Sequence, residues 1–542
     1  MASVSFPLAG KHKQGTWFGV EGSEDYDSFF SCLYGLSPQD SRADSKIDDD
    51  QKQSIQVSQP AEKSVQNEQQ PTPFSLACLE VLKTYDKLFN KPTDEGEGVN
   101  HNNKYNASSC SCTCGKLSVN EVLKLGGERY IQYITPRADG FSMFMHPYAS
   151  ALSALTAHET RDVELVHLLL AAAEDVSRRQ YDVAANLISR CMWTASHSGN
   201  PVQRLVFYFA EALKERIDRE TTGGRLFTAA RYHYQEYCMG LTTTPATLAC
   251  HQGLPFSQVM QFAGIQTIIE NVNTTKIHLL DFNIRSGIQW TILMQALAEE
   301  HHDRPIQLIK ITAVGVADQH KLEECGNRLE SFARSLNLPF AFHLVFLSDL
   351  KDFREDLVHL EADESVAVYA NTVFRTMIGR PDCLDSLILA IRKLKPVVMV
   401  VAEVEANHNS PSFITRFIEA LFFYGAFFDC FEDCMERKDP CRRTIEGIHF
   451  GEGIINIVAA EGEERFTRNV KIDVWRAFFA RLGMVEIKLS ECSMYQAKLI
   501  LKQFEHGSSC NLYSNGNGLI VGWKGTPIHS VTCWKFNSHD DY

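Results

Sequence analysis

The chain has 542 residues, of which 44% are hydrophobic and 22% are charged, a balance that is typical of globular proteins. This length exceeds what one ordinary hydrophobic core contains, so two or three structural units are expected. The formal net charge of −14, from 53 basic and 67 acidic side chains, argues against a surface that coats nucleic acid generally. Basic clusters are short, such as Arg178-Arg179 and Arg442-Arg443, so only local patches for phosphate remain.

The start of the chain, MASVSFPLAGKHKQ, reaches Lys11 before an apolar segment develops, which predicts no secretory signal. No apolar run approaches the roughly 18–20 residues that a membrane span requires. The 16 cysteines are spread along the chain, and this spread favours reduced thiols over a disulfide framework. The sequence therefore predicts a soluble protein of the cytosol or the nucleus.

Residues 1–72 are acidic, rich in Ser and Gln, and contain the run Asp48-Asp49-Asp50. They offer too little apolar surface to offset the entropy of ordering the chain, so we expect this region to be disordered. One stretch within it, EDYDSFFSCLYGL at 24–36, mixes acidic and aromatic side chains. It is either a tail with scattered aromatics or a segment that folds in the groove of a partner.

Residues 73–145 are expected to be a helical lead-in, with a first helix over 74–90 and then a polar loop. Ser118 and Glu121 form a capping box that begins the next helix. The cysteines of the loop lack the C-x-x-C pairs of a structural zinc site, which favours loop thiols over metal ligands. These cysteines are Cys110, Cys112 and Cys114.

Residues 146–542 are expected to form the main domain, in two parts. Residues 146–270 are almost free of strand signals and form a mainly helical cap, in which Leu165 and Leu169 share one face of a helix. Residues 271–542 form an α/β core, because β-rich runs alternate with amphipathic segments and predict a parallel sheet with helices on both faces. Strands are expected at 276–281, 305–314, 340–346, 365–371 and 396–404, and helices at 287–300, 319–336, 381–394 and 411–432.

The end of the chain adds strand candidates at 484–490, 519–524 and 527–534. The last two are joined by Gly525-Thr526, a link that permits only an antiparallel hairpin. The expected fold class is therefore α/β: a Rossmann-type, methyltransferase-like, mostly parallel sheet with a C-terminal antiparallel hairpin, plus an α-helical cap.

The turn after the first strand lies where open α/β sheets bind their ligands. A cofactor turn needs glycines where the backbone approaches the ligand. After Asp281 the chain reads Phe-Asn-Ile-Arg-Ser before it reaches Gly287, so side chains fill the places of glycines. Binding of a dinucleotide or of S-adenosylmethionine by the usual route is disfavoured, and no cofactor is expected.

Five motifs follow one another along the chain: LVHLLLAAAEDV, IHLLD at 277–281, GNRLESFARSLNLPFAFH, the pair VAEVEANHNSPSFITRFIEALFFYGAFFDCFE and INIVAAEGEERFTR, and the pair VWRAFFARLGM and GWKGTPIHSVTCW. In this order they resemble the first leucine-rich, VHIID, second leucine-rich, PFYRE and SAW regions of the plant GRAS transcriptional regulators. The resemblance covers about residues 116–542. The motif residues singled out are Ile277, His278, Leu279, Leu280, Asp281, Gln289, Trp475, Trp523 and Trp534.

The chain also departs from the family pattern. VHIID reads IHLLD, and the SAW triplet reads TCW at 532–534. The Arg-Glu element of the PFYRE region is reduced to Arg443 and Glu446. The acidic motifs of the gibberellin-responsive DELLA branch are absent from 1–115, so we do not expect a typical member of that branch.

Two polar groups are candidates for chemistry. His278 and Asp281 are either an acid–base pair at the strand mouth or structural groups, and the structural interpretation is favoured. Glu403 and Glu405 lie two residues apart near the end of the fifth strand and so project to one face, with Asn407, His408 and Asn409 at the rim. They form either a pocket for a small molecule or structural hydrogen bonds. No Ser-His-Asp order, phosphate loop or zinc spacing indicates an enzyme.

The stretch LVHLL, with Leu165, Leu168 and Leu169, fits the LxxLL pattern of some coregulator helices. The pattern alone is weak, and core packing or a homodimer face is the favoured explanation of these leucines. The resemblance implies that such leucine-rich regions contact transcription factors and other GRAS proteins.

The resemblance implies a transcriptional regulator that acts in the plant nucleus through protein–protein contacts, as a homodimer or a heterodimer. Direct contact with DNA stays open. The alternative is a small-molecule-binding or methyltransferase-like protein that uses the cleft at the carboxyl ends of the strands.

Overall fold

The computed structural model describes residues 74, 76–78, 80, 117–134, 155–222, 245–300, 305–361 and 363–537. These residues all belong to one structural unit, Gln69–Tyr542. The predictions made for residues 1–72, for the aromatic stretch 24–36 and for the three loop cysteines lie outside the described residues. Of the helix expected over 74–90, the described residues are helical.

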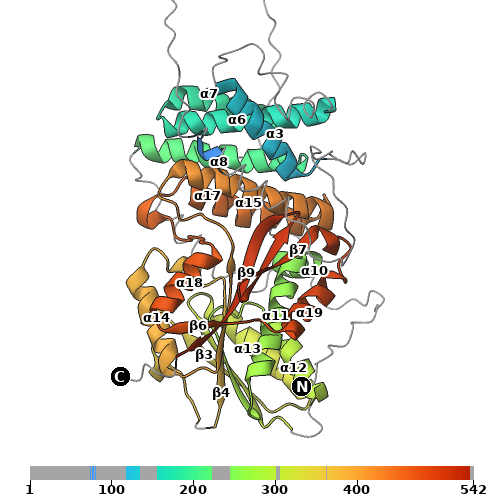
Figure 1. Cartoon of the computed structure of the whole chain (residues 1–542), viewed down its shortest axis with the longest axis vertical. Helices are drawn as coiled ribbons and strands as arrows, with labels where there is room; N and C mark the ends of the chain where they lie inside the picture. Colours follow the sequence, from blue (N-terminus) through green and yellow to red (C-terminus); the bar gives the residue numbers. More distant parts are fainter. Residues whose placement is uncertain are drawn as a thin grey trace, which may run out of the picture. The chain divides into compact units, whose positions relative to one another are not determined.

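A layer of helices precedes the first strand and forms the upper part of Figure 1. Helix α6 is continuously helical because its first turn is capped: the Thr156 hydroxyl accepts from the backbone N–H of Glu159, and the Glu159 carboxylate accepts from the backbone N–H of Thr156. The layer consists of α3 (Val119–Ile134), α6 (Ala157–Ser177), α7 (Tyr181–Thr194) and α8 (Pro201–Thr222).

Helix α15 (Phe413–Cys434) lies between this helical layer and the sheet (Figure 1). It contacts α3, α6 and α8 on one side and β8 and β9 on the other. Its sequence, FITRFIEALFFYGAFFDCFEDC, is apolar on nearly every face, as expected for a helix that is buried all round. The cap is therefore joined to the core through a shared hydrophobic helix.

The sheet runs in the order β3-β2-β1-β4-β5-β9-β8-β7, and β6 also pairs with β9. The first five strands are parallel, whereas β9 is antiparallel to β5. The strands are β1 (Lys276–Asp281), β2 (Leu308–Gly315), β3 (Phe340–Phe346), β4 (Ser365–Asn371), β5 (Val398–Val404), β6 (Met484–Ile487), β7 (Cys510–Asn515), β8 (Gly518–Trp523) and β9 (Thr526–Phe536). The predicted fold class is confirmed, including the hairpin of β8 and β9.

Strand β9 has two different partners along one edge. Its first half pairs with β8, from Thr526 opposite Trp523 to Val531 opposite Leu519. Its last four residues pair with β6. Because β6 and β5 are both antiparallel to β9, β6 is parallel to the main sheet. Strand β7, of sequence CNLYSN, was not predicted, since its short and polar run resembles a turn.

Helices cover both faces of the sheet (Figure 1). Helices α14 (Pro381–Lys393) and α18 (Ile472–Arg481) contribute to one hydrophobic core with β1, β4 and β5. The other helices are α10 (Pro245–Gly253), α11 (Pro255–Asn271), α12 (Ile288–Glu300), α13 (Gln319–Ser335), α16 (Pro440–Thr444), α17 (Glu452–Val458) and α19 (Glu491–Leu501). Residues Ile445–Gly451 form the π-helix η4. None of the described helices has the length and apolar character of a membrane span.

Candidate functional site

The signature strand β1 places His278 and Asp281 on opposite faces of the sheet, because side chains alternate along a strand and the two lie three residues apart. His278 bonds to groups on β2 and before β4, whereas Asp281 bonds to the turn and to α12. The interpretation of these residues as an acid–base pair is therefore wrong. The alternation rule alone predicts this outcome.

His278 is fully buried and links three segments of the sheet. Its Nδ1 lies 2.9 Å from the carboxylate of Glu364, and its Nε2 lies 2.8 Å from the hydroxyl of Thr312. Burial lowers its pKa to about 4, while the charge of Glu364 raises it. A neutral imidazole therefore donates from Nδ1 to Glu364 and accepts from Thr312 at Nε2. Lys310 forms an ion pair with the same carboxylate. This arrangement stabilises the strands and leaves no ring nitrogen for catalysis.

Asp281 holds the turn that follows β1. Its carboxylate accepts from the backbone N–H of Asn283 at 2.8 Å, from Gln289 Nε2 at 3.0 Å and from Trp290 Nε1 at 2.8 Å. Burial raises the pKa of Asp281 to about 6, although these hydrogen bonds lower it. The hydrogen-bonding capacity of this carboxylate is thus occupied by the protein itself.

The turn leaves little room for a ligand to approach its backbone. Phe282 and Ile284 are buried within it, and they line the small hollow in front of the strand together with Val314–Ala317. Gly287, at φ 71°, adopts a left-handed conformation in which a Cβ would lie 2.8 Å from the sulfur of Cys325. The glycine therefore serves packing of the turn against α13.

A polar cluster surrounds the carboxyl end of β5, where the sequence predicted Glu403, Glu405 and Asn409. Glu403 accepts from the backbone N–H of Phe374 at 2.8 Å, and Glu405 accepts from that of Ile472 at 2.9 Å. Burial raises the pKa of each carboxyl group to about 7. Asn409 accepts from Arg468 Nη1 at 3.2 Å. The two carboxyl groups thus fix the segments that follow β4 and precede α18.

The structure adds residues to this cluster that the sequence did not single out. They are Arg375 after β4, and Arg465, Arg468 and Asn469 after α17, and they surround His408, which the sequence already placed at this rim. Arg375 was within reach of prediction, because it follows the carboxyl end of a parallel strand. The other three come from a distant segment without any periodic signal, so only the fold brings them here.

The three signature tryptophans are buried in the core. Trp475 stacks on Phe479 with ring centroids 5.7 Å apart, and Trp534 packs on the same ring at 4.8 Å. Trp523 lies at the other end of the hairpin, where its Nε1 donates to Asp429 of α15 at 2.9 Å. Their positions join the last strand to α18 and to α15, which is a structural role.

Helix α6 buries most of the predicted interaction set. Leu165 is 2% exposed and Leu169 is 0% exposed, whereas Leu168 is half-buried. The helix packs against α3, α7 and α8. The interpretation of Leu165 and Leu169 as an exposed LxxLL face is therefore wrong in this structure, and core packing explains both.

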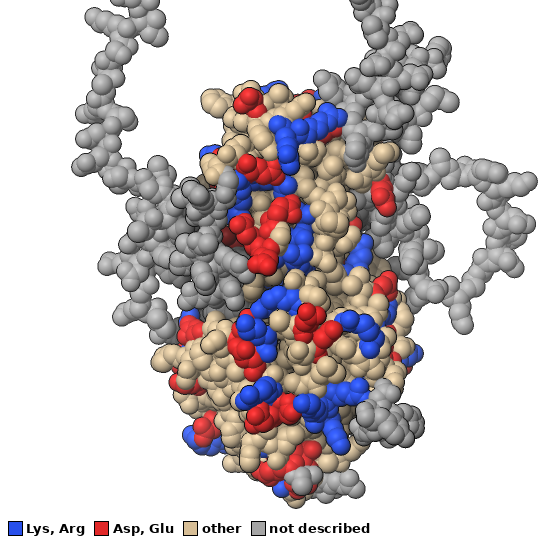
Figure 2. Space-filling model, turned by 90° about the vertical axis from the view of Figure 1, so that its left-hand side faces the viewer, with Lys and Arg blue, Asp and Glu red and all other residues tan. Residues whose placement is uncertain are grey.

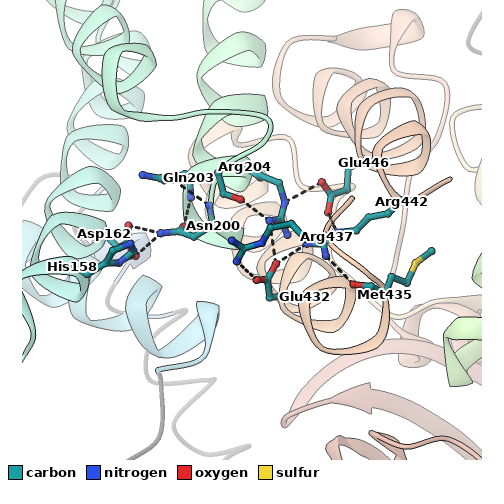
Figure 3. Close-up of polar contacts among 11 residues, drawn as sticks. His158, Asp162, Asn200, Gln203, Arg204, Glu432, Met435, Arg437, Arg442 and Glu446 are labelled. Atoms are coloured by element: carbon teal, nitrogen blue, oxygen red, sulfur yellow. Dashed lines mark hydrogen bonds and ion pairs between the residues drawn. The ribbon is translucent and has the colours of Figure 1, made fainter. Parts of the chain in front are cut away.

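A buried ionic network joins the cap to the core (Figure 3). Arg204 of α8 pairs with Glu432 of α15 at 3.1 Å and with Glu446 of η4 at 3.0 Å. Arg442 pairs with the same two carboxylates, at 2.7 Å and 3.1 Å. Of the Arg-Glu element aligned to Arg443 and Glu446, only Glu446 belongs to this network, because Arg443 is exposed and the neighbouring Arg442, four residues before Glu446, forms the ion pair. Arg437 adds a further ion pair to Glu432.

Comparison with known proteins gives the family. The GRAS domain family model matches residues 165–535. The chain belongs to the GRAS family. Scarecrow-like protein 18 of Arabidopsis thaliana is 31% identical over 68% of this chain and 91% of that protein. DELLA protein 2 of Medicago truncatula is 28% identical over 70% of this chain and 68% of that protein.

A solved GRAS structure has the same fold. The crystal structure of SCL7 from Oryza sativa matches 68% of this chain and 99% of that chain, with a TM-score of 0.59 and 27% identity. The resemblance to the GRAS family that the sequence motifs indicated is thereby confirmed, and so is the predicted fold of a mostly parallel sheet with a helical cap.

Proposed function

We propose that this GRAS protein is a transcriptional regulator of the plant nucleus that acts through contacts with transcription factors and with other GRAS proteins, as a homodimer or a heterodimer. The observation that carries the proposal is the GRAS domain match, which spans residues 165–535 and so includes both the cap and the sheet. No cofactor is part of the proposed mechanism.

The geometry of the strand mouth supports a regulatory rather than an enzymatic function. The Asp281 carboxylate already accepts three hydrogen bonds from the protein, and His278 lies on the opposite face. A methyltransferase would need a glycine-rich turn with free polar groups at this place. Here the same strand and turn act as a frame for the surfaces around them.

The charge distribution supports protein partners more than extended contact with nucleic acid. On the face shown in Figure 2, basic and acidic side chains are interspersed from the helical layer to the far end of the sheet. Ion pairs such as Arg219 with Glu464 and Arg481 with Asp385 balance local charge. A surface that neutralises phosphates would instead gather unpaired Lys and Arg.

The test uses the full chain. We expect transcription factors and other GRAS proteins to co-purify with it from plant nuclear extract, and equilibrium dialysis to show no retention of S-adenosylmethionine. Retention of S-adenosylmethionine without any transcription factor would reject the proposal. A Leu168→Ala variant tests whether the half-exposed leucine of α6 contributes to partner binding. If fewer partners co-purify while the circular dichroism spectrum is unchanged, Leu168 contacts a partner.

A further inference from the structure

Three arginine side chains meet around the loop that follows β5. Arg375 lies in the turn η3 (Phe374–Thr376) after β4, whereas Arg465 and Arg468 follow α17. The backbone N–H of Arg468 donates to the carbonyl oxygen of Arg375 at 3.0 Å, which joins the two segments. The cluster therefore lies at the carboxyl ends of β4 and β5, the edge at which open α/β sheets bind ligands.

Among the described residues, the hydrogen-bond acceptors of these guanidinium groups are all neutral. The contacts are Arg375 Nη1 to Asn469 Oδ1 at 3.4 Å, Arg468 Nη1 to Asn409 Oδ1 at 3.2 Å and Nη2 to the Gly462 carbonyl oxygen at 2.6 Å, and Arg465 Nη1 to the Ser410 carbonyl oxygen at 3.3 Å. Each contact uses an amide oxygen, which carries no formal charge. The three positive charges are therefore not balanced by these contacts.

Among the described residues no carboxylate forms an ion pair with them, although the charges of Glu403 and Glu461 attract Arg375 and Arg465 from farther away. Within the part of the chain that the structure describes, no Asp or Glu oxygen lies within 4.0 Å of the side-chain nitrogens of Arg375, Arg465 or Arg468. The nearby Glu461 is already paired with Arg216 at 2.9 Å and with Arg416. The cluster is thus a local excess of positive charge in a chain that is acidic overall.

The excess is most severe at Arg465, which is 5% exposed. Burial and the charges of Arg416 and Arg468 lower its pKa to about 10, and the opposing charge of Glu461 offsets this only in part. A buried cation without a counter-ion is unfavourable, and one partner of opposite charge offsets much of that cost. An anion at this place would supply such a partner.

His408 adds a donor that points to the same conclusion. Arg375 has only donors, so the atom of Asn469 that it contacts is the oxygen, and the Asn469 amide N–H then donates to His408 Nδ1 at 2.8 Å. The histidine is neutral, because burial and the charge of Arg375 lower its pKa to about 3. Its proton therefore resides on Nε2, which is buried and has no hydrogen-bond partner in the structure.

The unsatisfied atoms of the cluster are donors. They are the Nε groups of Arg375, Arg465 and Arg468 and the Nε2 of His408. Gly379 packs closely on the Arg468 guanidinium, since a Cβ at that position would lie 3.2 Å from its Nε. Glu403 also has one oxygen without a partner, and its pKa, raised to about 7 by burial, lets it hold a proton near neutral pH. Buried polar groups in proteins are normally satisfied, so this concentration calls for an acceptor.

We propose that Arg375, Arg465, Arg468 and His408 form a binding site for a small oxyanion, namely the phosphate or carboxylate group of a small molecule. Charge and hydrogen bonding agree on this class, because an oxyanion supplies both the negative charge and several acceptors, and guanidinium groups bind it with charge-assisted hydrogen bonds. The site goes beyond the regulatory function proposed above and does not depend on it.

The test is thermal unfolding and titration calorimetry of the full chain in sodium phosphate, sodium acetate and sodium chloride at equal ionic strength. We expect phosphate, acetate or both to raise the unfolding midpoint saturably above its value in chloride, by the linkage of binding to folding. A shift with phosphate alone assigns a phosphorylated ligand, and a shift with acetate assigns a carboxylate. Equal midpoints in all three salts overturn the proposal.

Arg375→Gln is the informative variant, because Gln keeps a donor for Asn469 but removes the charge. We expect it to weaken anion binding roughly tenfold or more, while its midpoint in chloride stays equal to or above that of the native chain. Arg375→Lys, which keeps the charge, should retain part of the binding. Arg334→Gln, at an exposed arginine of α13, is the matched control and should leave binding unchanged.

A structural role for Arg375 gives the opposite pattern. The midpoint of Arg375→Gln would then fall in chloride as well, and the remaining protein would keep the full anion-dependent shift. That result, or an equal loss of binding in Arg334→Gln, overturns the site.

Discussion

At the scale of single residues, burial decides roles that sequence position suggests only loosely. Leu165, Leu168 and Leu169 belong to one sequence pattern, yet only Leu168 reaches the surface. Glu403 looks like an acidic pocket residue in the sequence, yet its burial raises its pKa to about 7. The burial of Leu169 and that of Glu403 each lead to a separate testable prediction.

Leu169→Ala should lower the free energy of unfolding by about 2–5 kcal/mol, because the side chain is fully buried between helices of the cap and its loss leaves a cavity. Leu168→Ala is the matched control one residue away, and its effect should be clearly smaller. Urea unfolding followed by circular dichroism measures both. Equal losses for the two variants would contradict the assigned burial.

The free energy of unfolding of the Glu403→Gln variant should rise relative to that of the native chain as the pH rises. The pKa of Glu403 is raised to about 7 in the folded state from 4.5, so its contribution to stability is present below about pH 4.5 and is lost as the pH rises through 7. Gln does not titrate, so the stability difference should shift by roughly 3 kcal/mol in favour of the variant across that range. Urea unfolding at several pH values measures this stability difference. Glu330→Gln, at an exposed residue of α13, is the control, and its stability difference should not change with pH.

At the scale of elements, the molecule is held together by contacts between segments that are far apart in sequence. Helix α15 joins the cap to the hairpin, and β9 joins β5, β6 and β8. The network of Arg204, Glu432, Arg442 and Glu446 fixes α8 against α15, α16 and η4 (Figure 3). Its energetic value depends on keeping both signs of charge in place.

Arg442→Ala should destabilise the protein by about 3–5 kcal/mol, because it leaves two buried carboxylates short of a partner. Arg443→Ala, at the exposed neighbouring residue, should change stability by less than about 0.5 kcal/mol. Thermal or urea unfolding of the two variants measures the difference. A large effect at Arg443 with none at Arg442 would show that the pairing is misassigned.

At the scale of the whole molecule, buried titratable groups make stability depend on pH. Burial lowers the pKa of one histidine to about 4 and of three others to about 3, whereas their unfolded value is about 6.5. These residues are His278, His408, His449 and His529. Asp281, Glu403 and Glu405, with raised pKa values, act in the opposite direction.

We expect the free energy of unfolding to fall as the pH is lowered from about 6.5 towards about 4. In this range the histidines bind protons in the unfolded chain but stay neutral in the folded protein. The four histidines outnumber these three carboxyl groups, so acid should destabilise on balance. Urea midpoints at about pH 7.5 and about pH 5 test this. A higher midpoint at the lower pH would mean that the carboxyl groups dominate.

The sequence by itself determined the fold class and the family, because both rest on local order: alternating strand and helix patterns, a tight link at Gly525, and motifs in a fixed succession. It also indicated that the turn after Asp281 is unlike a cofactor-binding turn, because the sequence itself shows that no glycine precedes Gly287 there. Even the separation of His278 from Asp281 follows from strand periodicity.

Only the tertiary structure decided which residues meet. Glu446 pairs with Arg204 of α8 as well as with Arg442, and only the folding of α8 onto η4 brings Arg204 to it. The burial of Leu169 depends on α3, α7 and α8, which the periodicity of one helix does not reveal. The arginine cluster at β5 combines segments about 90 residues apart along the chain, and charge balance at such a place is a property of the folded arrangement alone.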